Sequence, residues 1–600
     1  MSDINKILSD VWGYSSFRAG QEEIINHLLQ KKSVLAIMPT GGGKSICFQI
    51  PALLFENQTV VVSPLVSLMN DQVVALKDVG VKAERVHSDM PDVDRVKAWE
   101  DFKKGDTKIL YISPESLMQH SILSELKPLR ISMFVIDEAH CISKWGSSFR
   151  KDYEQLKDLG TLFPDSVISA FTATADEETR ADINQKLTKG KGKIFLNKFN
   201  RPNLSLAVQE KKSWQKQLLE FLAGRDNEAG IVYCLSRKDT ESCALHLANK
   251  GFNAMHYHAG MEKFEKAKVQ DRFMTEDNLI ICATIAFGMG IDKSNVRFVV
   301  HISLPGSMEN FYQEIGRAGR DGLESDTLLM FGLQDLFQRR KHIFDSDASD
   351  AWKLKEGKRL ESLMAYCDSA ICRRQTLLAY FEETCDPCGK CDNCLNPPQM
   401  IEGTEYAQMI MSAIYRTGQY FGANHVVDVV RGVQTEKVKQ KGHDKIQTFG
   451  VGRTASADFW KTFIRQLVSS KYLKINIQKY GALQITPEGE KVLNGLEEYF
   501  YRKICFNKPI KEKRIKADVI DSDTLNEERE LLSSLKSTRL QLAKEIRVPA
   551  YIIFPDATLH QMILHKPQTI EEMGHLNGVG PHKLEKYGEF FLNVIKKSME

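Results

Sequence analysis

A glycine-rich loop between an apolar strand and a helical segment is the feature that most restricts how this chain can fold. The segment MPTGGGKSICFQIPALL starts at the end of the apolar run VLAIM (34–38) and continues into a helical pattern. Gly41, Gly42 and Gly43 leave the backbone free to turn its N–H groups towards phosphate oxygens. A strand before the loop and a helix after it predict an α/β layer structure in the N-terminal part.

The residues around the glycines add the chemistry of a nucleotide site. The Lys44 side chain can reach the β- and γ-phosphates, and the Ser45 hydroxyl can ligate Mg²⁺. Thr40 belongs to the same candidate site. The strict motif has glycine where this chain has Met38, so a glycine loop with an incidental Lys-Ser pair is the alternative. The strand-to-helix context favours a nucleotide-binding loop.

Short apolar runs alternate with longer helical patterns as far as about residue 335. The first series of expected strands is 34–38, 59–63, 108–113, 132–137 and 167–173, and the second is 230–234, 253–258, 279–284, 297–302 and 327–331. This alternation is typical of parallel sheets covered by helices. We therefore expect two α/β domains, the second beginning near residue 205, after NRPNL.

An acidic tetrapeptide, DEAH (137–140), follows the expected strand SMFVID. The carboxyl ends of parallel strands are where α/β sheets place ligand chemistry. Asp137 would hold Mg²⁺ through water, and Glu138 would orient or deprotonate the attacking water. His140 completes the candidate catalytic set. A solvated Asp-Glu pair at a helix start is the alternative, which the upstream phosphate loop disfavours.

Two arginines in the second α/β unit can supply positive charge to the same site. Arg317 and Arg320 lie three residues apart in QEIGRAGRDG, which places them on one face if the segment is helical. Guanidinium groups at a domain interface can neutralise charge that develops on the γ-phosphate. The alternative is an ordinary pair of salt-bridging arginines.

Six of the twelve cysteines crowd into residues 367–394, and the other six are scattered. Scattered thiols in a chain of this length indicate a reducing compartment and disfavour disulfides. The CxxCxxC spacing with a further cysteine upstream suits tetrahedral Zn²⁺ coordination, although an iron–sulfur cluster also uses spaced cysteines. We expect a structural metal site whose occupancy adds folding energy. The candidate ligands are Cys372, Cys385, Cys388, Cys391 and Cys394.

The last third of the chain changes character. Residues 405–470 show amphipathic helices, and YLKINIQKYGALQIT (472–486) alternates apolar and polar residues around a Tyr-Gly turn, which predicts a β-hairpin. Helices followed by a hairpin suggest a winged helix. Residues 502–516 hold seven Lys or Arg and one Glu, as a basic linker would. Residues 524–600 form a last helical unit.

Length and charge set broader limits. Six hundred residues suggest three to five domains. The net charge of +3 is close to neutral for this length, so only local clustering of charge can indicate a partner. No apolar run approaches 18 residues and no basic segment precedes an apolar one at the start, so we expect neither a membrane span nor a signal peptide.

These motifs, in this order, resemble superfamily 2 helicases and, more closely, the RecQ family of DNA helicases. The matching segments, which span essentially the whole chain, are YSSFRAGQEEII (14–25), TGGGKS (40–45), SPLVSLMNDQV (63–73), DEAHCISKWG (137–146), FTATA (171–175), YHAGM (257–261), ATIAFGMGIDKSNVRFVVH (283–301) and YQEIGRAGRDG (312–322). The resemblance implies a multidomain α/β chain: two tandem RecA-like domains (1–204 and 205–335), a zinc-binding helical subdomain (336–400), a winged helix (401–500), a basic linker (501–523) and a small all-helical helicase-and-RNase-D C-terminal domain (524–600).

The resemblance also implies roles for single residues. ATP would bind in the cleft between the RecA-like domains, with Gln21 reading adenine, Arg18 in the same motif and Asp292 at the ribose. Ala19 stands where the family usually has proline. The implied zinc ligands are Cys372, Cys388, Cys391 and Cys394, which leaves Cys385 and Cys367 over, and Cys385 could compete for the metal.

Single-stranded DNA would cross the tops of both domains. The implied contacts are Trp145, Phe149 and Arg150, in a loop that commonly reads WGHDFRP in the family and reads WGSSFRK here. Tyr480, at the hairpin tip, would stack on a terminal base pair, or it is a turn residue without a partner. In the last domain, Lys583, Lys586 and Tyr587 either contact DNA or form a solvated face.

The family implies an ATP-dependent helicase that moves 3′ to 5′ on single-stranded DNA and unwinds forked or tailed duplexes in recombination, repair and replication-fork processing. We expect ATP, Mg²⁺ and Zn²⁺ as cofactors, a single-strand DNA-binding protein as a partner by analogy, and a cytoplasmic, nucleoid-associated location. The rivals are an RNA helicase, since DEAH also occurs there, and an annealing factor with a vestigial ATPase.

Overall fold

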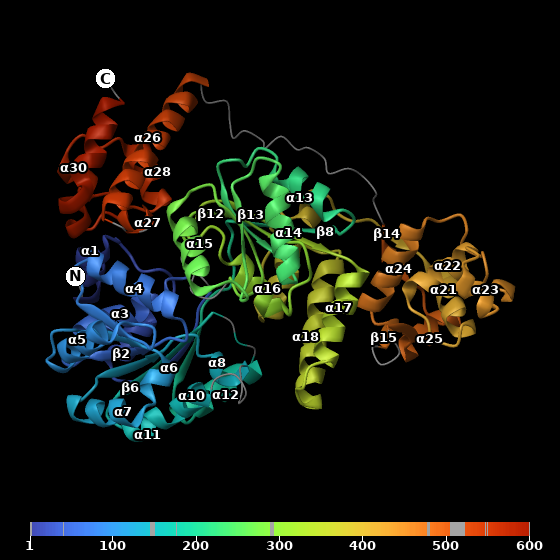
Figure 1. Ribbon diagram of the computed structural model, residues 1–600, viewed down its shortest axis with the longest axis horizontal. Helices are drawn as coiled ribbons and strands as arrows, with labels where there is room; N and C mark the ends of the chain where they lie inside the picture. Colours follow the sequence, from blue (N-terminus) through green and yellow to red (C-terminus); the bar gives the residue numbers. More distant parts are fainter. Residues whose placement is uncertain are drawn as a thin grey trace.

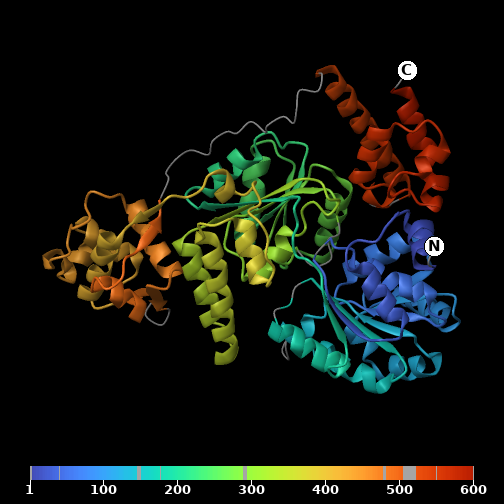
Figure 2. The same ribbon diagram turned by 180° about the vertical axis from the view of Figure 1, so that it is seen from behind.

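The computed structural model describes residues 3–39, 41–144, 151–173, 175, 177–287, 293–476, 481–503, 522–546, 548 and 550–598. Figure 1 shows two α/β domains next to each other, with the last helical unit beside the first domain and the region 400–502 at the opposite end. The view from behind gives the same arrangement (Figure 2). Among the helices of these ranges, none is long and apolar enough to span a membrane.

The first domain is built on a seven-stranded sheet of order β3-β4-β2-β5-β6-β1-β7, and its strand pairs are all parallel. Central strands such as β5 are buried along their whole length because helices cover both faces of the sheet. The strands are β1 (Val34–Ile37), β2 (Thr59–Val62), β3 (Ala83–Val86), β4 (Ile109–Ile112), β5 (Met133–Ile136), β6 (Val167–Thr172) and β7 (Lys193–Leu196). The α-helices are α1 (Asp3–Trp12), α2 (Gln21–Leu29), α3 (Lys44–Leu54), α4 (Val66–Asp78), α5 (Asp92–Lys103), α6 (Pro114–Leu117), α7 (His120–Leu126), α8 (Cys141–Lys144), α10 (Lys151–Gln155), α11 (Leu159–Leu162) and α12 (Glu177–Thr188).

The second domain has a six-stranded parallel sheet of order β10-β11-β9-β12-β13-β8. Its strands are β8 (Leu204–Glu210), β9 (Ala229–Tyr233), β10 (Ala254–Tyr257), β11 (Ile280–Ala283), β12 (Val296–His301) and β13 (Ser325–Phe331). Its helices are α13 (Trp214–Leu222), α14 (Arg237–Ala248), α15 (Lys263–Thr275) and α16 (Met308–Ile315). Helix α14 begins at a capping box, in which Ser236 and Asp239 satisfy each other's backbone N–H groups.

The prediction of five strands in each domain is wrong in number, because β3, β7 and β8 were not expected. All three lie at sheet edges. Strand β3 reads AERV, three of the four residues of β7 are exposed, and β8 alternates between buried and partly buried positions. Edge strands are covered less completely than central ones, so they lack the continuous apolar run on which the prediction depended.

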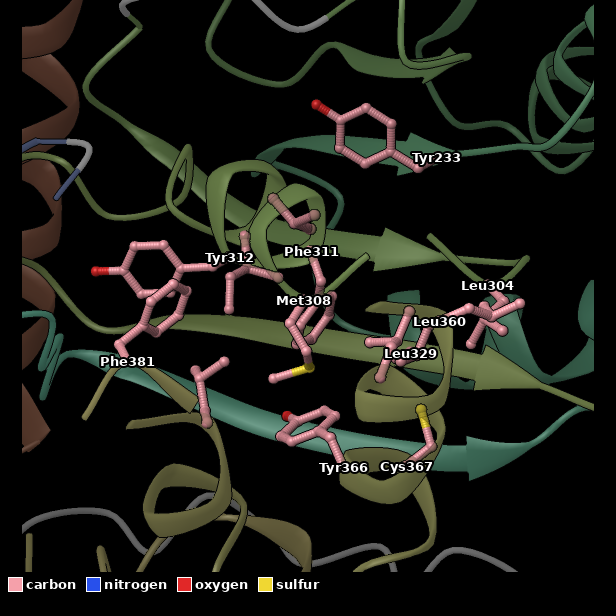
Figure 3. Packing of buried hydrophobic residues seen from close by; sticks show 14 of the residues in the cluster. Tyr233, Leu304, Met308, Phe311, Tyr312, Leu329, Leu360, Tyr366, Cys367 and Phe381 are labelled. Carbon is pink, nitrogen blue, oxygen red and sulfur yellow. The ribbon is translucent and has the colours of Figure 1, made fainter. Parts of the chain in front are cut away.

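A helical subdomain follows the second sheet. It consists of α17 (Leu333–Phe344), α18 (Asp350–Asp368), α19 (Arg373–Tyr380) and α20 (Asp392–Leu395). Its buried side chains join the core of the second domain: Phe311 and Tyr312 of α16 lie beside Tyr366 and Phe381 in Figure 3. The subdomain is therefore packed onto the second α/β domain through a shared apolar core.

The next region contains the expected hairpin. Strands β15 (Leu473–Asn476) and β16 (Ala482–Ile485) are antiparallel, with Leu473 opposite Ile485. The other elements are β14 (Met400–Glu402), α21 (Thr404–Arg416), α22 (Ala423–Arg431), α23 (Glu436–Gln440), α24 (Ala457–Ser469), α25 (Pro487–Leu493) and β17 (Phe500–Arg502). Strand β17 pairs with β14, so residues 501 and 502, which we expected to belong to the basic linker, are part of a strand.

The last unit is helical, as expected. Its helices are α26 (Ser522–Ile546), α27 (Ala550–Ile553), α28 (Asp556–His565), α29 (Ile570–Gly574) and α30 (Pro581–Lys597). It packs closely on the first domain: the Gly578 N–H donates to the Gly13 carbonyl at 3.1 Å, and a Cβ on Gly13 would come within 2.4 Å of the Gly580 nitrogen. Because Gly13 also has a φ of +71°, glycine is required there.

Candidate ATP-hydrolysis site and zinc centre

A cleft of about 740 Å³ lies between the two α/β domains and the last helical unit. The predicted site residues that line it are Arg18, Gln21, Gly41, Gly43, Lys44, Ser45, Asp137, Glu138, His140, Arg317 and Arg320. Gly42 belongs to the same loop, and Thr40 and Asp292 lie outside the described residues. Residues of α27 and α28 also line the cleft, which the sequence did not predict.

The glycine loop takes the shape that its sequence predicts. Gly41 and Gly43 have φ of +78° and +77°, and helix α3 starts at Lys44. The Gln21 amide donates to the Gly43 carbonyl at 3.0 Å, and the Arg18 backbone N–H donates to the Gln21 side-chain oxygen at 2.8 Å. Gln21 therefore fixes the loop in place from the start of helix α2.

The acidic tetrapeptide lies at the carboxyl end of β5, opposite the glycine loop. The Lys44 Nζ is 3.6 Å from the Glu138 Oε1, and the His140 Nδ1 is 3.2 Å from the Glu138 Oε2. His140 also shares a hydrogen bond of 2.8 Å with the Thr172 hydroxyl. Glu138 has a φ of +47°, a strained value for a residue with a side chain, and such strain is common at functional sites.

The pKa values of Asp137 and Glu138 are shifted in opposite directions. Burial, followed by the negative charge of Glu138, raises the pKa of Asp137 to about 6. Burial also acts to raise the pKa of Glu138, but Lys44 and His140 outweigh it and hold this pKa well below its usual range. Glu138 is therefore the carboxylate that stays ionised, as an acceptor of a proton must be.

Arg317 and Arg320 reach the cleft from the turn after α16. The expected helical face is not seen, because α16 ends at Ile315 and both arginines lie in turns. The Arg320 Cγ would be 3.4 Å from a Cβ on Gly41, so this side chain lies against the glycine loop. Arg317 also lines the cleft, and its positive charge helps to lower the pKa of Glu138.

Four cysteines gather beside helix α19. The sulfur atoms of Cys372, Cys388, Cys391 and Cys394 all lie within 4.8 Å of one another, and this is the one such group among the described residues. Backbone N–H groups bind two of the sulfurs: Cys388 donates to Cys372 at 3.3 Å, and Arg373 donates to Cys391 at 3.4 Å. Four converging thiols with such donors suit tetrahedral Zn²⁺.

The two remaining cysteines of the cluster lie outside this group. Cys367 is buried in the apolar core beside Tyr366 (Figure 3). Cys385 is partly buried and is not one of the four whose sulfur atoms converge. The arrangement thus separates Cys385 from the ligand set with which it could compete.

Trp145, Phe149, Arg150 and Tyr480 lie outside the described residues, as do Ser147 and Ser148. In the last unit, where we expected Lys586 and Tyr587 either to contact DNA or to form a solvated face, the Lys586 ammonium and the Tyr587 hydroxyl both donate to Asp78 of the first domain. Lys583 donates to the Ile552 carbonyl, and burial lowers its pKa to about 8.

Comparisons with known proteins agree with this architecture. The family models that match are the DEAD/DEAH box helicase (residues 18–183), the helicase conserved C-terminal domain (211–322), the RecQ zinc-binding domain (333–395), the RQC domain (397–508) and the HRDC domain (528–595). The ATP-dependent DNA helicase RecQ of Pasteurella multocida is 40% identical over 596 residues, which cover 98% of this chain and 93% of that protein.

The chain belongs to the RecQ family. The RecQ helicases of Haemophilus influenzae and Bacillus subtilis are 39% and 36% identical, and each match covers 98% of this chain. Membership confirms the predicted family, the predicted fold class and the assignment as an ATP-dependent DNA helicase. The RecQ zinc-binding model ends at residue 395, directly after Cys394.

A residue next to the cleft lining was also missed. Arg201 lies between β7 and β8, where the chain passes from the first domain to the second, and its guanidinium contacts the loop of Arg317 and Arg320. The signal available in the sequence was an arginine in NRPNL, at the expected domain junction. No motif of the phosphate site pointed to it.

Proposed function

We propose that this RecQ-family chain uses ATP hydrolysis in the cleft to move 3′ to 5′ along single-stranded DNA and to unwind tailed or forked duplexes. The observation that carries the proposal is the ion pair of Lys44 with Glu138, 3.6 Å apart, in a cleft whose other wall holds Arg317 and Arg320. A phosphate-binding lysine and a candidate base thus face two arginines of the partner domain. This is the arrangement that phosphoryl transfer to water requires.

Each side chain has a distinct task in this proposal. Lys44 binds the β- and γ-phosphates, and Glu138, kept ionised by Lys44 and His140, orients the attacking water and accepts its proton. Arg317 and Arg320 neutralise the charge that develops on the γ-phosphate. Because they come from the second domain, hydrolysis depends on closure of the two domains.

Ser45 and Asp137 would hold Mg²⁺. Their donor set, a hydroxyl and a carboxylate, consists of the hard oxygen ligands that this ion prefers. The pKa of Asp137 is about 6 because burial and Glu138 oppose its ionisation, and a bound cation would reverse that effect. When bound, the ion supplies charge neutralisation for the phosphates.

The zinc centre has a structural role in this proposal. Cys372, Cys388, Cys391 and Cys394 would bind the ion, and no open coordination position is left for chemistry. The subdomain shares its apolar core with the second α/β domain, so folding around the ion also supports that domain.

DNA would be bound by side chains that the family resemblance assigns. Trp145, Phe149 and Arg150 would stack on bases and contact phosphate, and Tyr480 would stack at the duplex end. Trp145 follows Glu138 by only a few residues, so a displacement of this loop by DNA would move the acidic end of the cleft. A single-strand DNA-binding protein as partner and a nucleoid-associated location complete the proposal by family analogy.

The decisive experiment is ATP-dependent unwinding of three duplexes, with a 3′ tail, with a 5′ tail and with blunt ends. We expect efficient unwinding of the 3′-tailed duplex alone. Efficient unwinding of only the 5′-tailed duplex would refute the polarity. ATPase stimulation by single-stranded RNA and not by DNA would favour the RNA-helicase rival, and strand annealing without any unwinding would favour the scaffold rival.

A further inference from the structure

Arg201 connects the inter-domain segment with the arginine loop of the second domain. Its guanidinium donates to the Ala318 carbonyl at 3.0 Å, to the Gly319 carbonyl at 2.7 Å and to the Gly316 carbonyl at 3.4 Å. These three residues surround Arg317 and precede Arg320 in the chain. One guanidinium therefore binds three backbone carbonyls of the turn that carries Arg317 and Arg320.

Asn203 supports the same turn two residues later. Its amide donates to the Gly319 carbonyl and to the Leu323 carbonyl, both at 2.9 Å. Gly319 has a φ of +57°, and a Cβ there would come within 2.4 Å of the Asn203 Nδ2. The turn thus leaves no room for a side chain at this point, and its backbone is held by two side chains from the inter-domain segment.

The guanidinium of Arg201 also faces the phosphate loop. A Cβ on Gly41 would be 3.3 Å from the Arg201 Nη1, and the Gly41 carbonyl accepts a hydrogen bond from Arg18. Arg320 lies against the same glycine. Burial lowers the pKa of Arg201, and the charges of Arg320 and Arg18 lower it further, which reflects how closely the three cations approach one another.

The zinc-binding subdomain contacts the backbone of Arg201 and of its neighbours. Arg374, two residues after Cys372, donates to the Arg201 carbonyl at 2.8 Å and to the Asn200 side chain at 3.0 Å. Phe199 stacks on Phe381 with ring centres 4.5 Å apart. The inter-domain segment is therefore held by contacts with the zinc-binding subdomain, and these contacts fix the backbone position of Arg201.

We propose that Arg201 is a positioning residue for ATP hydrolysis, which holds the Arg317–Arg320 turn against the phosphate loop when the cleft closes. This inference rests on the proposed function of the cleft. Three carbonyls are bound by one planar group, and a lysine ammonium cannot reproduce that fork of donors. Replacement by lysine should keep the positive charge but let the turn shift.

The test compares Arg201→Lys with the wild-type protein in DNA-stimulated ATP hydrolysis. We expect kcat to fall at least about tenfold, as for loss of a transition-state contact, with the KM for ATP changed less than about twofold. A second measurement uses ADP with and without aluminium fluoride, which imitates the transferring phosphoryl group. The wild type should have a higher affinity for ADP when aluminium fluoride is present. The variant should lose this gain in affinity but should bind ADP alone as tightly as the wild type does.

Arg225→Lys is the matched control. Arg225 is a partly buried arginine of the second domain whose guanidinium binds the Phe221 carbonyl and the carboxylates of Glu228 and Asp326. Its replacement should lower thermal stability without any effect on kcat or on the gain from fluoride. The inference is overturned if Arg201→Lys retains both kcat and the gain from fluoride, or if Arg225→Lys loses them to the same extent. Absence of ATP hydrolysis by the wild type would instead refute the proposed function.

Discussion

Lys586, in helix α30, donates a hydrogen bond to Asp78, the last residue of helix α4, over 3.0 Å. The Tyr587 hydroxyl donates to the same carboxylate oxygen at 2.9 Å. Arg539 approaches Asp277 of the second domain at 3.5 Å. The last unit thus contacts both α/β domains next to the cleft, although its sequence shows no sign of that position.

Asp78→Ala should release the last unit from the first domain. Asp78 is almost fully buried and accepts both hydrogen bonds, so its removal should weaken the contact by about 2 kcal/mol. Small-angle X-ray scattering should show a larger radius of gyration. Asp92→Ala is the control, because Asp92 is exposed and forms an ion pair with Arg95 on its own helix. An unchanged scattering profile for Asp78→Ala would show that other contacts hold the unit.

Lys44→Ala should lower the ATPase kcat by at least about 100-fold, because the charge that binds the β- and γ-phosphates is removed. Binding of single-stranded DNA should be nearly unchanged, which fluorescence anisotropy with a labelled oligonucleotide would measure. Lys32→Ala, at an exposed lysine whose ammonium donates to the Gln30 side chain, should leave both properties intact. Substantial turnover by the Lys44 variant would contradict the role of Lys44.

The residues proposed for the chemistry of the site could be predicted more fully than the residues that position them. Lys44, Glu138 and Arg317 lie in compact motifs whose residue types follow from the proposed reaction, so the sequence was sufficient to place them in one candidate site, and all three line the cleft. Arg201 acts through backbone carbonyls more than one hundred residues away, and any sequence offers carbonyls. The contact with Asp78 joins residues about five hundred positions apart and depends on domain packing. Local patterns carry no information on such pairs.

Cys391→Ser should abolish stoichiometric zinc binding and lower the free energy of unfolding of the subdomain by several kcal/mol, because its sulfur is buried among the other three. Zinc content by atomic emission and thermal unfolding would measure both effects. Cys385→Ser provides a close control, since its sulfur is not part of the group. Equal zinc loss in the two variants would mean that the ligand set includes Cys385.

Asp556 should stabilise the last unit in a pH-dependent manner. Burial opposes its ionisation, but Arg539 at 2.8 Å and Lys536 at 3.5 Å outweigh burial and lower its pKa to about 2. A lowered pKa gives stability that is complete above the unfolded value of 3.8 and is lost as the pH falls towards 2. Asp556→Asn should therefore cost about 2 kcal/mol near neutral pH.

Urea unfolding of the wild type and of Asp556→Asn at a series of pH values would measure this difference. The gap should be constant from about pH 8 to about pH 5 and should close below about pH 4, where the wild-type carboxylate also becomes protonated. A gap that widens as the pH falls would contradict the assignment of the shift to the ion pairs with Arg539 and Lys536.

Ser147 and Ser148 stand where the family commonly has histidine and aspartate, between the implied DNA contacts Trp145 and Phe149. We expect the loop to transmit DNA binding to Glu138 only weakly, because an imidazole and a carboxylate are replaced by two small hydroxyls. The double variant Ser147→His, Ser148→Asp should raise the ratio of DNA-stimulated to basal ATPase by about fivefold, at the lower end of ordinary coupling energies. Trp145→Ala should lower the same ratio, which tests whether the loop transmits the signal at all. If the double variant keeps the wild-type ratio while Trp145→Ala lowers it, the aromatic side chains carry the coupling and the two serines do not weaken it.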